Sequence, residues 1–287
     1  MITIDIIIGG LLTGGIYALL AVGFNLQYGV VRVMNVAHGE FIMLAAMSTY
    51  SLFVAFGINP LISLAIFGPM MLLVGLMIHK VLFERLRRVS GSIETFEGRS
   101  LLITFGLLFI VQNVAFIAWG ADIRGYTFLS NPINLLGAKF AANRIFVLFF
   151  SLFTLLIFYF FLVGTRLGKG IRAATQEMKG AQLVGINIQR MYGLCFGLGA
   201  LLAGFTGVLM STMFAVSPVM GFHYTIIAVI VVVLGGLGNI LGSLVGGLIL
   251  GIISSFVLRF EPGLELVVFY ILFMMILLWK PRGIFGK

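Results

Sequence analysis

Residues 34 to 40 read MNVAHGE and place an amide, an imidazole and a carboxylate within six positions, at Asn35, His38 and Glu40. The grouping stands out because the chain has only three histidines and nine acidic residues among 287. Two strongly apolar stretches flank it. Burying a charged group is costly unless the group is paired and hydrogen-bonded. We therefore expect these side chains either to reach an aqueous interface or to line a polar cavity.

Two interpretations of this segment stay open, and its position alone favours the first. In that one, Asn35 caps a new helix at the cytoplasmic interface, and Glu40 lies in the first turn near the positive end of the helix dipole. In the second, the segment is a break between helices that lines the path of a solute.

The residues give little support for a metal site or for nucleophilic catalysis. Three scattered histidines and the single Cys195 offer no zinc-ligand spacing. No serine, cysteine or histidine stands in the context of a nucleophile elbow or a catalytic triad. We therefore predict no catalytic residues, no metal site and no cofactor, and we expect the chain not to be an enzyme.

The composition identifies the environment of these side chains. Apolar residues make up 61% of the chain and charged residues 9%, with a mean hydropathy of +1.19. Such values are typical of an integral membrane protein. The net charge of +9 is not evidence for nucleic-acid binding, because the basic residues lie between apolar blocks.

The apolar blocks predict an all-α, polytopic transmembrane helical bundle with eight to nine spans in a single domain, residues 1–287. The first block has no basic residue before it and reads as a retained span, not a signal peptide. The expected spans are 4–27, 39–56, 60–79, 101–119, 145–163, 191–212, 224–236, 240–258 and 264–279. The segment 224–236 is short, and a re-entrant MNVAHGE would favour eight crossings.

The basic residues predict the orientation. Five lie in 80–100, five in 164–190, three after residue 279 and one at Arg32, which is 14 of the 18. By the positive-inside rule, the N-terminus is outside and the C-terminus, with both of these connections, is cytoplasmic. The acidic and basic residues of 80–100 read as a solvated loop or a contact surface.

Glycine is the second compositional signal, with 37 residues, many of them four apart within the expected spans. Such spacing lets helix backbones approach closely in lipid. It predicts a tightly packed bundle, with most glycine pairs meeting inside the chain. The sequence GGLGN at 235–239 predicts a tight turn with positive φ angles.

Two further segments carry polar residues with a possible role. Within 164–190, a stripe of small apolar residues at helical spacing predicts a short amphipathic helix: Ile171, Ala174, Met178, Ala181 and Val184. We interpret its alanine-rich face as a docking surface for a soluble protein, and lipid headgroups are the alternative. In the fourth span, Gln112 and Asn113 either bridge helices or hydrogen-bond a solute.

The motifs taken together resemble the permease subunits of bacterial branched-chain amino-acid ABC importers. The resemblance covers essentially the whole chain in the family's order. It is carried by GGIYALLAVG, NVAHGE, LLITFGLLFIVQN, WGADIRGY, RAATQEMKGAQLVGIN, SPVMG, VVVLGGLGN and KPRGIFGK. The departures are Leu241, where many members have a proline, and a connection at 80–100 that is more acidic than usual.

The resemblance implies a permease of the bacterial inner membrane that forms half of a translocation pathway without chemistry of its own. The implied partners are a second, non-identical permease, two cytoplasmic ATP-binding subunits and an extracytoplasmic solute-binding protein. Residues 171–187 resemble the coupling helix that contacts the ATPase. The contact residues that we choose are Arg172, Glu177, Gly185 and Asn187. Branched-chain amino acids are the expected solute.

In that picture, Asn35, His38, Glu40, Gln112 and Asn113 are candidates for the central path or gate. Two other classes stay open. A gradient-driven secondary transporter or channel would normally carry a charged residue deep within a helix, and the sequence suggests none apart from the segment ends. An intramembrane enzyme or scaffold is disfavoured by the lack of catalytic pairs.

Overall fold

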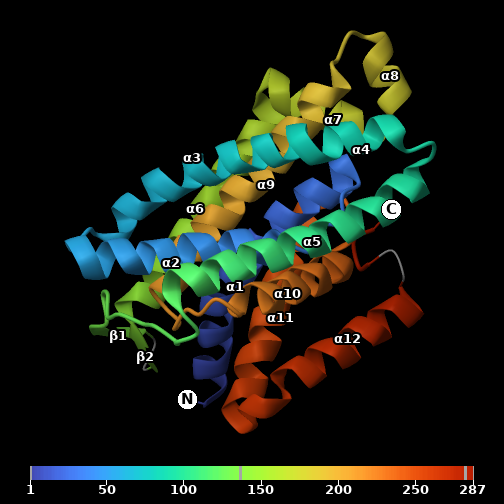
Figure 1. Ribbon diagram of the computed structural model, residues 1–287. Coiled ribbons are helices and arrows are strands. Elements are labelled where there is room, and N and C mark those ends of the chain that lie inside the picture. Colours follow the sequence, from blue (N-terminus) through green and yellow to red (C-terminus); the bar gives the residue numbers. More distant parts are fainter. Residues whose placement is uncertain (1, 136–137, 281–282, 287) are drawn as a thin grey trace.

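The computed structural model describes residues 2–135, 138–280 and 283–286. These form a bundle of helices with one small hairpin of two antiparallel strands, in which Pro132 pairs with Ala141 (Figure 1). The first half of the chain comprises α1 (Ile2–Val31), α2 (His38–Phe56), α3 (Pro60–Ile78), α4 (Glu84–Val89), α5 (Ile93–Trp119), β1 (Pro132–Leu135) and β2 (Ala138–Ala141). The second half comprises α6 (Ala142–Gly164), α7 (Arg166–Gln176), α8 (Met178–Leu183), α9 (Ile188–Ser211), α10 (Met220–Gly235), α11 (Ile240–Phe260) and α12 (Glu265–Trp279).

Eight helical segments within the described residues are long and apolar enough to cross a membrane, and α10, with 16 residues, is a shorter apolar helix. This agrees with the expected all-α bundle of eight to nine spans. Every expected span corresponds to a helix, with ends that differ by a few residues in most cases.

The largest difference is in residues 80–100, which we expected to form a loop. The helix α3 continues through a π-helical turn at His79–Phe83 into α4, and α5 begins at Ile93, so the expectation is wrong. Charged side chains do not disrupt a helix that extends beyond the lipid, and here they support it. Glu84 pairs with Arg88 one turn later at 2.6 Å, and Ser92 caps α5 by accepting from the backbone N–H of Thr95 at 3.2 Å.

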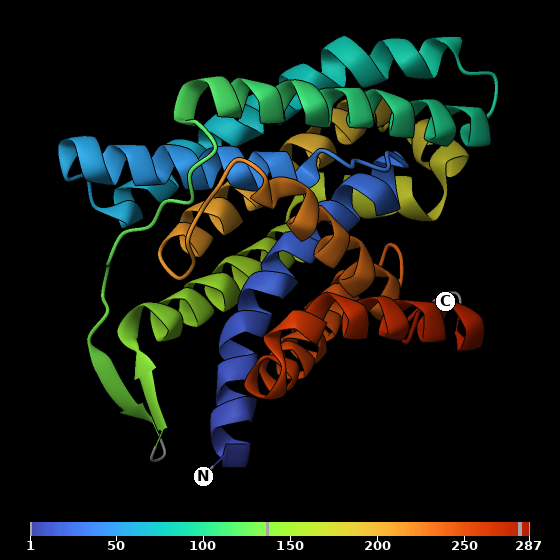
Figure 2. The same cartoon turned by 60° about the horizontal axis from the view of Figure 1, so that its bottom comes forward.

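The helices divide into a central group and a peripheral group. In α1 and α9, 72% of the most apolar 18-residue stretch of the helix is buried inside the molecule. The corresponding share is 17% in α5 and 6% in α12. Figures 1 and 2 show α1 and α9 surrounded by other helices, with α5 and α12 on the outside. The apolar side chains on the outer faces of α5 and α12 are therefore available to lipid or to another subunit.

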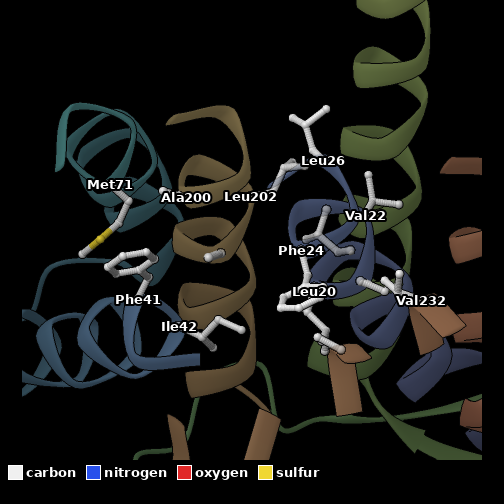
Figure 3. Close-up of a cluster of buried hydrophobic side chains, with 14 of the residues drawn as sticks. Leu20, Val22, Phe24, Leu26, Phe41, Ile42, Met71, Ala200, Leu202 and Val232 are labelled. Carbon is white, nitrogen blue, oxygen red and sulfur yellow. The ribbon is translucent and has the colours of Figure 1, made fainter. Parts of the chain in front are cut away.

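Glycines bring the central helices together. Gly10 and Gly14 of α1 lie against Gly251 and neighbouring backbone of α11, where an added Cβ would collide with main-chain atoms. The expected packing of these glycine faces within the chain is confirmed. Larger side chains fill the remaining space, and Figure 3 shows α9 between Phe41, Ile42 and Met71 on one side and Leu20 and Phe24 on the other.

The two ends of the bundle differ in their connections. The N-terminus and the β1–β2 hairpin lie at one end, whereas α4, α8 and the C-terminal residues lie towards the other (Figures 1 and 2). The turn at GGLGN is at this second end, and it has positive φ angles at Gly236 (99°) and Gly238 (80°), as expected. Most of the basic residues in the connections are thus on the same end as the C-terminus.

Candidate solute pathway and coupling surface

The segment MNVAHGE is a re-entrant break between α1 and α2. The helix α1 ends at Val31, and Arg32 reverses the chain with a φ of 60°. The ring of His38 then lies 5.6 Å from that of Phe24, seven residues before the end of α1. At 1.5 Å per residue, α2 begins about 10 Å inside the bundle, measured along α1.

This geometry corrects the first interpretation of the segment. The residue that precedes the first turn of α2 is Ala37, and Asn35 does not cap this helix. The side chains of Asn35, His38 and Glu40 are all 0% exposed, so they do not reach an aqueous interface. The structure therefore has the broken helix of the second interpretation, with the polar side chains enclosed.

Gln27 of α1 holds two of these side chains. Its Oε1 accepts a hydrogen bond from Asn35 Nδ2 at 2.9 Å and lies 3.2 Å from His38 Nδ1. Its Nε2 donates to the carbonyl of Phe196 in α9 at 3.1 Å. Since the amide oxygen can only accept, the proton of a neutral His38 is on Nδ1, and Nε2 presents a lone pair.

Two threonines fasten the backbone of the same segment. Thr225 of α10 donates to the carbonyl of Val36 at 2.9 Å and accepts from the N–H of Gly39 at 2.8 Å. Thr104 of α5 donates to the carbonyl of Met34 at 2.9 Å and accepts from the N–H of Val36. These bonds satisfy backbone groups that would be costly to bury unpaired. Gln27 and Thr225 are two functional candidates that were not expected from the sequence, although both are polar residues within apolar spans.

The first turns of α2 and α10 meet at two glycines. A Cβ on Gly39 would collide with the carbonyl of Gly221, and a Cβ on Gly221 would collide with the carboxylate of Glu40. The carboxylate of Glu40 therefore lies beside the N-terminal turns of two helices. The N-terminus of a helix carries a partial positive charge, which offsets part of the cost of burying an anionic carboxylate here.

Four buried atoms of this cluster have no hydrogen-bond partner among the described residues: Asn35 Oδ1, His38 Nε2, Glu40 Oε1 and Glu40 Oε2. Leaving a buried polar group unpaired costs about 1–3 kcal/mol, and more if it is charged. All four atoms are acceptors when His38 is neutral and Glu40 is ionised. The cluster can thus receive a group that donates hydrogen bonds, such as an ammonium.

Gln112 and Asn113 are not part of this cluster. The buried stripe of α5 includes Ser100, Thr104 and Leu108, and Asn113 lies about 180° around the helix from Thr104. Asn113 is exposed, and its Nδ2 donates to the carbonyl of Phe109 in the same helix at 2.8 Å. The structure therefore places Asn113 on the outer face of α5, away from Asn35, His38 and Glu40, whereas Gln112 is half-buried, about 40° around the helix from Leu108.

The segment 164–190 forms two helices where we expected one. The chain breaks at Glu177, which has φ −149° and ψ 100°, between α7 and α8. Ile171, Ala174 and Ala181 are buried, and α7 packs against α6, α9 and α1. The expectation that the alanine-rich face is free for a partner is therefore wrong, because this face attaches the segment to its own bundle.

The exposed part of the segment is the turn after α8. Leu183 is 89% and Val184 76% exposed, and Gly185 continues the turn with a φ of 84°. Asn187 caps α9 by accepting from the N–H of Arg190 at 3.0 Å. Arg172, Glu177, Gly185 and Asn187 are all exposed, so the structure leaves the four chosen contact residues on the surface.

Residues 6–277 match the model of a family described as branched-chain amino acid transport system, permease component. The permease protein BraD of a high-affinity branched-chain amino acid transport system in Pseudomonas aeruginosa is 28% identical, over 98% of this chain and 95% of that protein. The corresponding LivH of Escherichia coli is 29% identical, over 97% and 94%.

Among solved structures, PsaBC from Streptococcus pneumoniae in complex with Fab has a similar fold. The TM-score is 0.52 with 12% sequence identity, over 96% of this chain and 91% of that chain. At this identity the similarity concerns the fold alone.

Proposed function

Since the chain belongs to the family of permease components of branched-chain amino acid transport systems, we propose that it forms half of the translocation pathway of an ATP-driven importer for these amino acids. It is a multi-pass membrane protein, and its whole length, 1–287, works as one transmembrane domain. The observation that carries the proposal is the family match over nearly the whole chain, together with a re-entrant polar segment enclosed at the centre of the bundle.

The proposed partners are a second, non-identical permease, two cytoplasmic ATP-binding subunits and an extracytoplasmic solute-binding protein. The apolar outer face of α5 gives a surface on which the second permease can pack. The N-terminus and the β1–β2 hairpin face the outside, whereas α4, α8 and the C-terminus face the cytoplasm of the bacterial inner membrane. The distribution of basic residues supports this orientation.

The turn at Leu183–Asn187 is the proposed contact with an ATP-binding subunit, together with Arg172 and Glu177. Its apolar tip is exposed, and its base is packed against the bundle through Ile171 and Ala174. A displacement of the turn is therefore passed to α6 and α9 instead of being lost in a mobile loop. Closure of the ATP-binding subunits then rocks the bundle between outward and inward access.

Asn35, His38 and Glu40 form the proposed central gate, which is closed in this conformation because all three side chains are buried. When the gate opens, its unpaired acceptors can hydrogen-bond the ammonium of a solute. Gln112 and Asn113 contribute to the path, Asn113 from the outer face of α5, where it meets the second permease, and Gln112 from its half-buried position on the same helix.

A gradient-driven transporter is the second candidate, and one observation favours it. Glu40 is a carboxylate deep in the bundle, a feature that the sequence did not suggest. The two candidates differ in what drives the flux. We expect leucine uptake into proteoliposomes to require the permease pair, the ATP-binding subunits, the binding protein and ATP. Uptake by this chain alone, driven by a proton or sodium gradient, would replace the importer with the transporter.

Glu177→Arg tests the coupling assignment. The side chain is exposed, so the variant should fold and insert normally while ATP-driven uptake is lost. Normal uptake combined with normal association of the ATP-binding subunits would refute this contact.

A further inference from the structure

A cavity of about 470 Å³ lies at the end of the bundle that contains the N-terminus. It is formed by α1, the start of α6, the first turns of α10, the end of α11 and the start of α12. Its volume is in the range of small-molecule sites, roughly 300–1,000 Å³. Charged side chains of both signs line it: Asp5, Arg144, Arg259 and Glu265.

One wall holds a fixed carboxylate. Glu265 is the first residue of α12, and its Oε1 accepts hydrogen bonds from the hydroxyl of Ser254 in α11 and from Tyr17 in α1 at 3.4 Å. Tyr17 is buried, so its hydrogen bond reaches this oxygen from the interior of the protein. Among the described residues, no basic side chain forms an ion pair with Glu265 within 4.0 Å. The carboxylate is therefore held by two hydroxyl groups without an ion pair at this distance, and the imidazole of His223 is in the same cavity.

The two guanidinium groups of the cavity also lack ion pairs among the described residues. Arg144 comes from the first turn of α6, and Arg259 from the last turn of α11. Within the described ranges, neither forms an ion pair with an acidic side chain at 4.0 Å or less. Guanidinium groups bind carboxylates through two parallel hydrogen bonds, so a ligand carboxylate suits them.

We infer that this cavity binds a free α-amino acid as a zwitterion. The ammonium of the ligand contacts Glu265, and its carboxylate contacts Arg144 and Arg259. Phe214 and Leu258, which also line the cavity, give an apolar surface for an aliphatic side chain. The inference rests on the proposed function, because it places the imported solute at the outer end of the path.

The position of the cavity relates it to the buried cluster. His223 and Tyr224 line the cavity from the first turns of α10. In the same turns, Gly221 is against the carboxylate of Glu40, and Thr225 bonds the N–H of Gly39. The first turns of α10 thus separate the two sites. A solute bound in the cavity is one helix away from the unpaired acceptors of the cluster.

The ligand chemistry has a second possible source, since the headgroup of phosphatidylethanolamine also combines an ammonium with an anion. The free amino acid fits better because its carboxylate and ammonium are attached to one carbon with an apolar side chain, and the cavity has surfaces for all three. Binding measured in membranes with and without phosphatidylethanolamine distinguishes the two sources.

The test measures binding of radiolabelled leucine to the assembled importer, without ATP, in nanodiscs of phosphatidylglycerol or of phosphatidylethanolamine. The complex is prepared without the solute-binding protein, so that only the permeases can bind the label. Competition with 4-methylpentanoate, which lacks the ammonium, and with 3-methylbutylamine, which lacks the carboxylate, separates the two charge contacts. We expect leucine to bind roughly tenfold or more tightly than either analogue.

The variants assign the contacts to residues. Glu265→Gln should abolish the advantage of leucine over 4-methylpentanoate, and the double variant Arg144→Gln/Arg259→Gln should abolish its advantage over 3-methylbutylamine. Glu265 also joins α12 to α1 and α11, so Glu265→Gln could fail to fold. In that case the arginine variant alone tests the inference. Glu261→Gln and Lys139→Gln are matched controls outside the cavity, and leucine binding should be unchanged in both.

Three results would overturn the inference. If both cavity variants keep the leucine affinity within about twofold while ATP-driven uptake continues, the cavity is not the site, although the proposed function stands. If phosphatidylethanolamine is retained by the wild type and lost from the arginine variant, with leucine binding unchanged, the ligand is a lipid headgroup. If the complete wild-type importer hydrolyses ATP and takes up no leucine, the proposed function fails and the inference fails with it.

Discussion

Two short polar interruptions of the apolar bundle, residues 34–40 and residues 177–187, have opposite environments. The first is enclosed, with Asn35, His38 and Glu40 fully buried and four of their polar atoms unpaired among the described residues. The second ends in an exposed turn in which the apolar Leu183 is 89% exposed. Each segment thus carries the type of side chain that its surroundings do not favour. A buried acceptor can bond a donor from outside the chain, and an exposed apolar tip can be covered by another protein.

The two segments also differ in what holds them. Hydrogen bonds from three helices, through Gln27, Thr104 and Thr225, fix the buried segment. The exposed segment is attached by apolar packing of Ile171 and Ala174. Substitutions in the first should therefore affect folding or the gate, whereas substitutions at the tip of the second should affect only assembly and coupling.

The largest effect is expected for Gly39→Val. The new side chain would collide with the carbonyl of Gly221, where both backbones are fixed, so we expect loss of folded protein in the membrane. Overpacking of this kind costs about 1–3 kcal/mol or more. Expression and thermal unfolding in detergent measure it. Gly106→Val is the matched control, because a Cβ at Gly106 meets no atom within 4 Å, and its protein level should be close to normal.

Leu183→Asp should come next, with loss of assembly and no loss of folding. The side chain is 89% exposed, so the protein tolerates a carboxylate there, but a partner that buries Leu183 does not. We expect at least tenfold weaker co-purification of the ATP-binding subunits, which corresponds to about 1.4 kcal/mol. Ile123→Asp, exposed in the connection after α5, is the control. Equal co-purification of both variants would remove the distinction between the two segments.

Glu40→Gln tests whether the buried segment acts in transport or only in folding. The carboxylate has no hydrogen-bond partner among the described residues, so replacing it with a neutral isostere should leave the unfolding temperature unchanged or raise it. Uptake should nevertheless fall about tenfold, because an ammonium loses its charged partner. A lower unfolding temperature with unchanged transport would make Glu40 a structural residue only.

The smallest effect is expected for Asn113→Ala on the outer face of α5. Its hydrogen bond is to the carbonyl of its own helix, so the stability of the isolated chain should change by less than about 0.5 kcal/mol. Interhelical hydrogen bonds in membranes contribute about 0.6 kcal/mol, and uptake should fall about threefold if the second permease meets this face. Uptake equal to that of the wild type would remove Asn113 from the path.

Much of the fold could be predicted from the sequence, because the apolar blocks fix the number and order of the helices. The ends were less accurate where charged residues continue a helix beyond the lipid. Arg87 illustrates this, since it is in α4 and donates to the carbonyl of Val31 at 2.5 Å, although its segment was expected to be a loop. A cluster of charges such as that in 80–100 marks where the chain leaves the lipid, and the helix can extend past that point.

The site was predicted in part. The composition of MNVAHGE singled out Asn35, His38 and Glu40, and the fold adds that α10 covers them, because Gly221 and Thr225 are about 180 positions away in the sequence. The stripe with Ile171, Ala174 and Ala181 was found correctly and given the wrong partner. A stripe of small apolar residues does not say whether it packs on its own chain or on another.

The most direct test of the account is the side of the membrane on which residues 177–187 lie. The native Cys195 is fully buried, so an added cysteine reports its own position. We expect a membrane-impermeant maleimide to label Lys139→Cys, in the β1–β2 hairpin, in intact cells. Leu183→Cys should be labelled only after the membrane is permeabilised. Labelling of Leu183→Cys in intact cells would put this turn outside, beyond the reach of any cytoplasmic ATP-binding subunit, and would contradict the account.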